Sequence, residues 1–278
     1  MRTRRHGHLV SNVLMVLVVT AAAAAFLAPL WWTLIWSTWH TDSIFSFPPK
    51  FLPGPDITSN FHNLQGSVNI IRAFANSVAV TVISVIGALA FCTLAGYVFA
   101  KMRFPARSVL FSLVLATMVV PGQITVVPLF VTMVRLGWVD TYQGLILPGL
   151  VPAIGVFFMR TSAQQGIPDE VIESARIDGA GELRIFASIV LPLLRPSLGA
   201  LSILLCAGTW GALYWPLVVL RSPDMYTLPL ALASLFGTAS QPYDQMMVGS
   251  LMAVVPPLIF FFIMQRHFVR SITLTGLK

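Results

Sequence analysis

The chain has 278 residues, of which 56% are hydrophobic and 10% are charged, and its mean hydropathy is +0.82. These values exclude an ordinary soluble globular domain and indicate a protein that crosses a membrane several times. The net charge of +7 does not by itself indicate a nucleic-acid partner, because the placement of the basic residues has a simpler explanation in membrane topology.

Six apolar segments are candidates for membrane-spanning helices, each of which needs roughly 20 apolar residues. They contain no Asp, Glu, Lys, Arg or His, as a lipid environment requires. A basic start followed by an Ala run also resembles a signal peptide, but the apolar sequence continues to Trp36, which favours an uncleaved first span. The predicted spans are Leu9–Trp36, Ser77–Ala100, Val109–Met133, Gly144–Met159, Ser197–Leu220 and Met246–Met264.

The distribution of Lys and Arg predicts the orientation of these spans, because short cytoplasmic loops are enriched in basic residues. Thirteen of the 17 basic residues lie on one side if both termini and the even-numbered connections are cytoplasmic. The sequence therefore predicts an all-α integral membrane domain with both termini in the cytoplasm and a cytoplasmic tail at 265–278. The connection 37–76 becomes an external loop, and its prolines predict extended and turn segments there.

The connection 160–196 differs from the others in its many charges, which place it outside the lipid. Pro168 is expected to begin a helix, with Asp169 and Glu170 complementing the dipole of its first turn. Gly179 and Gly181 end that helix, and a second helix runs from about Glu182 toward Pro192. At helical spacing, one stripe is apolar and the other side polar. The apolar stripe consists of Ile167, Val171, Ile172 and Ala175, and the polar side of Asp169, Glu170, Glu173 and Arg176.

Two interpretations of this polar helix are open. It could be a solvated connector on the bilayer surface, or a helix that offers one face to a partner protein. Ile177 lies one turn beyond Glu173, and small residues, Ser174 and Ala180, lie nearby. Small residues allow a partner protein to approach closely, and an exposed Ile is stabilised when a partner buries it, so this pattern favours docking.

The sequence also limits the energy source of a transporter. Proton-coupled carriers use ionisable residues inside the membrane, which the predicted spans lack, whereas sodium coupling through backbone carbonyls stays open. A phosphate-binding loop needs Gly-Lys-Ser/Thr, and none of Lys50, Lys101 and Lys278 follows a glycine. ATP, if used, must therefore be hydrolysed by a separate polypeptide that docks from the cytoplasm.

The stretch from Glu173 to Pro192 reads E-S-A-x-x-x-G-x₉-I-x-L-P and resembles the EAA loop of ABC importer permeases. Ser174 replaces the usual second Ala. The segments "ARIDGAGELRIFASIVLPLLRPSL", "VVPGQITVVPLF" and "TYQGLILPGLVPAIGVFFMR" resemble the carbohydrate branch, the maltose-type inner-membrane permeases, as does the tail "QRHFVRSITLTGLK". The resemblance covers most of Ser77–Lys278.

The resemblance implies a function, an arrangement of partners and a location in the plasma (inner) membrane of a bacterium or archaeon. The chain would be a permease subunit, not an enzyme, moving a carbohydrate or related polyhydroxy solute. Its partners would be a sister permease, cytoplasmic ATP-binding subunits that carry ATP and Mg, and an extracytoplasmic solute-binding protein. The residues implied in coupling to the ATPase are Glu173, Ser174, Ala175, Ile177, Asp178, Gly179, Ala180, Ile189, Leu191 and Pro192.

Within this implied arrangement, Glu173 would pair with a basic group of the ATPase, and Gly179 would permit the turn. Ile189, Leu191 and Pro192 would fasten the second helix to the membrane core. Alternative cargoes are glycerol phosphate or another non-sugar solute. A secondary carrier or channel, or an anchoring subunit without a pathway, are alternatives from other classes that the Glu173 motif disfavours.

Four residues are candidates for a substrate pathway, although a packing role is an alternative for each: Gln123, Trp210, Tyr214 and Trp215. The segment "GTWGALYWPLVVL" departs from the family, which often has a polar pair where Gly211 and Ala212 stand. Neither the scattered histidines nor Cys92 and Cys206 have metal spacing, so no metal or cofactor is expected in this chain.

Overall fold

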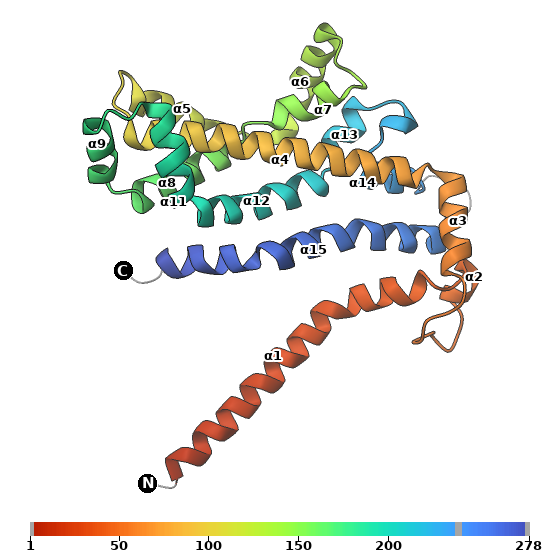
Figure 1. Ribbon diagram of the computed structural model, residues 1–278. Helices are drawn as coiled ribbons and strands as arrows, with labels where there is room; N and C mark the ends of the chain where they lie inside the picture. Colours follow the sequence, from red (N-terminus) through yellow and green to blue (C-terminus); the bar gives the residue numbers. More distant parts are fainter. Residues whose placement is uncertain (1–2, 237–240, 276–278) are drawn as a thin grey trace. The chain divides into compact units, whose positions relative to one another are not determined.

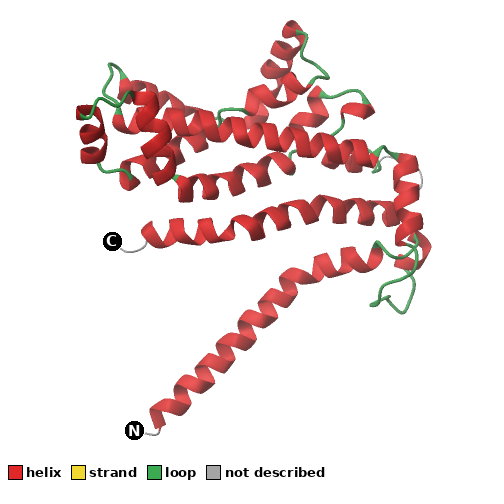
Figure 2. Ribbon diagram, in the orientation of Figure 1, coloured by secondary structure: helices red, strands yellow, loops and turns green. Residues whose placement is uncertain are grey.

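The computed structural model describes residues 3–236 and 241–275 of the chain. Within these ranges every regular element is a helix, and no strand is found (Figure 2). The predicted all-α fold class is therefore confirmed for the described residues. Arg2 and Lys278, which contributed to the predicted orientation of the termini, lie outside them.

Within the described residues, three helices are long and apolar enough to cross a membrane: Asn12–Trp36 in α1 (Thr3–Trp36), Ile70–Lys101, which is α4, and Tyr243–Gln265 in α15 (Tyr243–Thr275). Three bent helix pairs raise the number to six if each is one span. They are α5 (Arg107–Val119) with α6 (Gly122–Leu136), α7–η1 (Tyr142–Gly149) with α8 (Ala153–Gly166), and Glu182–Leu193 with α12 (Arg195–Trp210).

Prolines account for the bends that divide the predicted spans. Val120 and Pro121 are extended and separate α5 from α6, which meet at 103°. Pro152 likewise precedes α8, at a bend of 43°. Proline lacks an N–H group and clashes with the preceding helical turn, so each proline ends the first helix and starts the next.

The predicted span Ser197–Leu220 is not one helix. α12 ends at Trp210, and the following residues form a separate short helix, α13 (Tyr214–Val219). The break falls at Gly211–Leu213, where Gly211 caps the end of α12. The segment before α12, Glu182–Leu193, is also helical, and the bend between it and α12 is 76°.

The chain divides into two compact units, and the first comprises Met1–Val68 and Ser234–Met252. It contains α1, α2 (Thr41–Ile44), α3 (Ile57–Ser67) and the start of α15. The prediction of extended and turn segments was wrong for 57–67, because the prolines of that loop all precede α3. Asn60 and Leu64 occupy one face of α3 and are buried, and Asn60 Nδ2 donates to the carbonyl of Ser37 at 2.9 Å.

The second unit, Asn69–Ala233 and Ala253–Lys278, is organised around α4. α8 and α12 pack along α4 (Figure 1). Small residues permit the closest approach: a Cβ atom on Gly96 would lie 2.7 Å from both the backbone nitrogen of Arg160 and the Cβ of Met159. Such small residues at helix contacts are typical of membrane proteins, because they bring two backbones together.

The end of α4 that is remote from Lys101 carries a buried polar residue, Asn76. Its Nδ2 donates to the carbonyls of Asp224 at 2.8 Å and Tyr226 at 3.0 Å, and its Oδ1 accepts from the hydroxyl of Tyr142 at 2.7 Å. Asn76 thereby joins α4 to α7 (Tyr142–Ile146) and to the segment with η3 (Pro223–Met225), which precedes α14 (Leu228–Ala233). Buried amides are stable only when paired in this way.

We predict that Gly96→Ala lowers the free energy of unfolding by about 1–3 kcal/mol, because the new methyl group meets backbone atoms of α8 that cannot move away. Thermal unfolding of the purified protein in detergent measures the effect. Gly66→Ala is the control, since nothing lies within 4 Å of its Cβ position in α3. Equal melting temperatures for the two variants would contradict the prediction.

Candidate functional site

The polar connection between α8 and α12 contains a short helix, α9 (Asp169–Ile177). Pro168, which we expected to be its first residue, is instead the extended residue before it, with ψ 139°. Asp169 and Glu170 lie in the first turn and Arg176 in the last, so their charges complement the helix dipole at both ends.

The end of α9 is a tight glycine turn. Gly179 has φ +82°, and the N–H of Ala180 donates to the carbonyl of Ala175 at 2.9 Å, as in a Schellman motif. Gly181, the second predicted helix-ending glycine, has an ordinary extended conformation, with φ −69°. Of the two glycines, Gly179 is thus the one whose backbone conformation disfavours a side chain.

α9 has one face packed on the protein. Ile172 and Ala175 are buried, as is Ile167 just before the helix, and they belong to the hydrophobic cluster that also contains Tyr97 and Met159. Val171, which we predicted in the same stripe, is instead 38% exposed. Val171 lies at the edge of the packed face, because that face is centred on Ile172 and Ala175.

The exposed side chains of the loop include two acids and two large apolar residues. Glu173, Ser174 and Asp178 are exposed. Ile177 is 86% exposed and Leu183, in α10 (Glu182–Ile185), is 81% exposed. Sequence reasoning singled out Ile177 but missed Leu183. The sequence did contain a signal for Leu183. Leu183 and Ile185 are two residues apart and lie on different sides of a helix, so only one of them can face the core.

The second helix of the loop runs through α10, a π-helical turn (Phe186–Val190) and α11 (Leu191–Leu193). Ile189, Leu191 and Pro192, the predicted fasteners, are half-buried, and Ile189 packs on the hydrophobic cluster. The fully buried residues are Ile185, Val190 and Leu194, which sequence reasoning did not select. Ala180 also packs against this cluster, so Ala175 and Ala180 face inward.

Two polar contacts tie the loop to the end of α4. Lys101 Nζ donates to the carbonyl of Ile167 at 2.6 Å and to Oδ1 of Asp169 at 2.5 Å. The hydrogen bond and the positive charge of Lys101 lower the pKa of the Asp169 carboxyl. This contact fixes the entry to α9.

The second contact fixes the exit from α9. Glu182 accepts hydrogen bonds from Arg176 Nε at 2.7 Å and from the Tyr97 hydroxyl at 3.1 Å. The hydrogen bond to Glu182 raises the pKa of Arg176, so this guanidinium stays charged. Tyr97 is buried in α4, and its ring packs on Phe186 with centroids 5.7 Å apart. α9 is therefore connected to α4 on both sides.

Three of the four pathway candidates line one cavity of about 470 Å³: Gln123, Tyr214 and Trp215. Trp215 Nε1 donates to the carbonyl of Gly144 at 3.0 Å, which fixes its ring, while Tyr214 is 53% exposed. Trp210 does not line the cavity. It is buried, it donates to the carbonyl of Ala253 at 2.8 Å, and its ring contacts Phe74.

This architecture matches that of known transport proteins. The family described as binding-protein-dependent transport system inner membrane component matches residues 92–274, which include the whole polar loop and the cavity residues from α6 to α13. The chain belongs to this family. It is thus a multi-pass inner-membrane permease of a bacterial ABC importer, a transport component and not an enzyme.

Individual relatives extend the similarity. The arabinooligosaccharides transport system permease protein AraQ of Halalkalibacterium halodurans is 43% identical over 205 residues, which cover 74% of this chain and 73% of that protein. The sn-glycerol-3-phosphate transport system permease protein UgpE of Agrobacterium fabrum is 32% identical and covers 94% of this chain and 95% of its own length.

The fold also matches a solved structure, a bacterial ABC transporter involved in the import of the acidic polysaccharide alginate. The TM-score is 0.79 at 22% identity, with 93% of this chain and 96% of that chain covered. At this identity the match shows the shared fold.

For this permease we predict that Gly179→Ala destabilises the turn after α9 by about 1–2 kcal/mol, because a Cβ atom opposes the left-handed conformation. Hydrogen exchange of the amides at 174–181 measures the loss of protection. Gly181→Ala is the matched control, since its backbone is ordinary and nothing lies within 4 Å of its Cβ position. Equal loss in both variants would disprove the role of φ.

We also predict an acid-sensitive anchor at the start of α9. Because the pKa of Asp169 is lowered in the folded protein, its contact with Lys101 stabilises the fold above the ordinary carboxyl pKa and is lost as the pH falls through the lowered value. Thermal unfolding from neutral to acid pH should show a larger loss of stability in the wild type than in Asp169→Asn, because the other carboxyls titrate in both proteins. Glu170→Gln, which changes the adjacent exposed acid, should retain the wild-type pH dependence.

Proposed function

We propose that this chain is the membrane subunit that couples ATP hydrolysis in partner chains to solute import through the loop Glu173–Pro192. In this proposal, six spans place both termini and the loop in the cytoplasm. α9 sits in a cleft of an ATP-hydrolysing subunit, with Glu173 beside a basic group of that subunit. ATP and Mg are bound by the partner, not by this chain.

The observation that carries the proposal is the division of the loop into a packed side and an uncovered side. Ile177 and Leu183 are more than 80% exposed, whereas Ile172 and Ile185, in the same two helices, are at most 2% exposed. Burying a large aliphatic side chain contributes about 1.5–3 kcal/mol, so two such residues flanked by Glu173 form a favourable docking surface.

The anchorage of the loop supports a role in transmitting motion. Lys101 and the Tyr97–Glu182–Arg176 contact both connect the surroundings of α9 to α4. A displacement of α9 by a partner would therefore act on α4, and through it on α8 and α12. The proposed partners are two ATP-binding subunits, a sister permease and an extracytoplasmic solute-binding protein.

We propose a neutral carbohydrate as the cargo. The AraQ relatives are named for arabino-oligosaccharides and UgpE for glycerol phosphate, so the relatives support both kinds of solute. The cavity favours the former. Among the described residues that line it are hydroxyl, amide and aromatic groups, including Ser84, Gln123, Thr125 and Tyr214, but no charged residue. A phosphate group would leave its charge without a partner there.

We predict that Glu173→Arg weakens the association with the ATP-hydrolysing subunit by about tenfold or more, because it reverses the charge that flanks the two exposed apolar residues of the docking surface. Co-purification from gently solubilised membranes measures it. Glu170→Arg, one turn earlier and also exposed, is the matched control and should retain the ATPase. Retention of the sister permease in both variants shows that the permease is folded, and equal ATPase yields would refute the docking role.

We predict that Gln123→Ala raises the solute concentration needed for half-maximal uptake several-fold, since it removes a hydrogen-bonding group from the cavity. Proteoliposomes with the complete importer and its binding protein are loaded with ATP, and uptake of an arabino-oligosaccharide is compared with that of sn-glycerol 3-phosphate. Uptake of the phosphate compound alone would overturn the carbohydrate proposal and leave the coupling proposal intact.

A further inference from the structure

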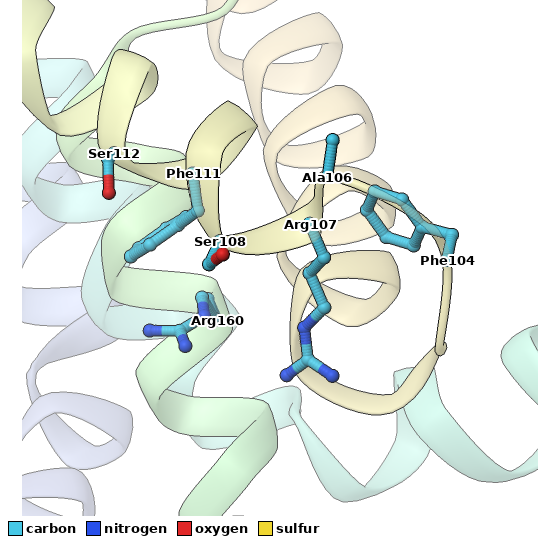
Figure 3. Close-up of a pocket in the computed structure, with 7 residues that line it drawn as sticks. All are labelled: Phe104, Ala106, Arg107, Ser108, Phe111, Ser112 and Arg160. Atoms are coloured by element: carbon cyan, nitrogen blue, oxygen red, sulfur yellow. The ribbon is translucent and has the colours of Figure 1, made fainter.

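A second pocket, of about 510 Å³, lies beside the connection from α4 to α5 and is lined by α5 and α8 (Figure 3). Neither the family loop nor the cavity with Gln123 includes it. Its chemistry is basic and hydroxylic, with two arginines and two serines. The lining residues are Phe104, Ala106, Arg107, Ser108, Phe111, Ser112 and Arg160.

The two guanidinium groups are held in place by the protein, and each has N–H groups to spare. Arg107 donates to the carbonyls of Met102 and Ala100, both at 3.1 Å. Arg160 donates from Nε to the carbonyl of Phe99 at 3.4 Å, and its guanidinium carbon lies 3.9 Å from the centre of the Phe111 ring. A guanidinium has five N–H donors, so these contacts orient both arginines without exhausting them.

The charges of Arg107 and Arg160 are not neutralised by the described part of the chain, in which neither forms an ion pair. Among the described residues that line the pocket none is acidic, and Figure 3 shows that both arginine side chains contribute to it, Arg107 from α5 and Arg160 from α8. Two like charges held close together in a half-buried site repel each other. An anion between them would replace this repulsion with charge-assisted hydrogen bonds.

The position of the pocket indicates the kind of anion. α4 ends at Lys101 and α5 begins at Arg107, so in the proposed topology the pocket lies where membrane segments end and the polar headgroups begin. Next to it, Val109 and Leu113 of α5 are 60% and 59% exposed. Arginine at such a boundary directs its charge to the headgroup layer, while neighbouring apolar residues contact acyl chains.

We propose that Arg107, Arg160 and Ser108 bind the phosphate of an anionic phospholipid from the leaflet that faces the polar loop. The lipid phosphate accepts hydrogen bonds from the two guanidiniums and the serine hydroxyl, and its chains lie along the exposed apolar residues of α5. Under the proposed orientation this is the cytoplasmic leaflet, where anionic lipids attract basic sites. A lipid source is favoured over free phosphate because exposed apolar side chains adjoin the charges.

The test uses the complete importer, purified in detergent and titrated with phosphatidylglycerol or phosphatidylcholine while bound lipid is counted by native mass spectrometry. Ser108→Glu places a carboxylate beside both guanidiniums without altering either arginine. It also adds an acid to the first turn of α5, which suits the helix dipole. Ser108→Gln is the control for size, and Gln165→Glu, exposed on α8 and outside the pocket, is the control for charge.

We expect the wild type and Gln165→Glu to retain phosphatidylglycerol in preference to phosphatidylcholine. Ser108→Glu should bind it about tenfold more weakly than the wild type, and Ser108→Gln, which removes the hydroxyl without adding a charge, should lie between the two. Equal retention in Ser108→Glu would overturn the proposal, as would equal binding of the two lipids. Inorganic phosphate that saturates the pocket in place of the lipid would identify a free-anion site instead. A carboxylate of a partner subunit seen between the two arginines in the assembled importer would also refute it.

Discussion

The close contact between α4 and α8 is the constraint on which the second unit depends. Gly96 allows the backbone of α8 to approach at Met159 and Arg160, where any larger residue would separate the helices. The hydrophobic cluster that includes Tyr97 and Met159 forms around this contact and extends into the polar loop through Ile172 and Ile185. In lipid, where water does not drive helices together, such fitted contacts provide much of the association energy.

The same helix organises both ends of the unit with polar groups. Asn76 connects it to the segments at 142 and 224–226, and Tyr97 and Lys101 connect it to the two sides of α9. Polar side chains near the ends of a span are costly to bury unless paired, so each of these residues has a definite partner. α4 thus links the proposed docking loop mechanically to the cavity side, since Val80 and Ser84 of α4 line the cavity with Gln123.

Two helix breaks bring side chains to the wall of the cavity. α5 and α6 meet at 103°, and Gln123, at the start of α6, lines the cavity. The break after Trp210 has a similar effect, since it releases Tyr214 and Trp215 from the line of α12 and allows them to reach the same cavity. Gly211 and Ala212 lie in that break, and Ala212 lines the cavity without adding a polar group.

By itself the sequence determined the all-α class, the apolar segments, the position of the polar loop and the family, because hydrophobic length, charge placement and the Glu173–Pro192 spacing are local properties. It also located the glycine turn at Gly179 and the exposed Ile177. Only the tertiary structure decided the exposure of Leu183, the exclusion of Trp210 from the cavity and the placement of Arg107 and Arg160 in one pocket. Each of these depends on which residues distant in the chain become neighbours, and periodicity within one helix carries no information about its neighbours.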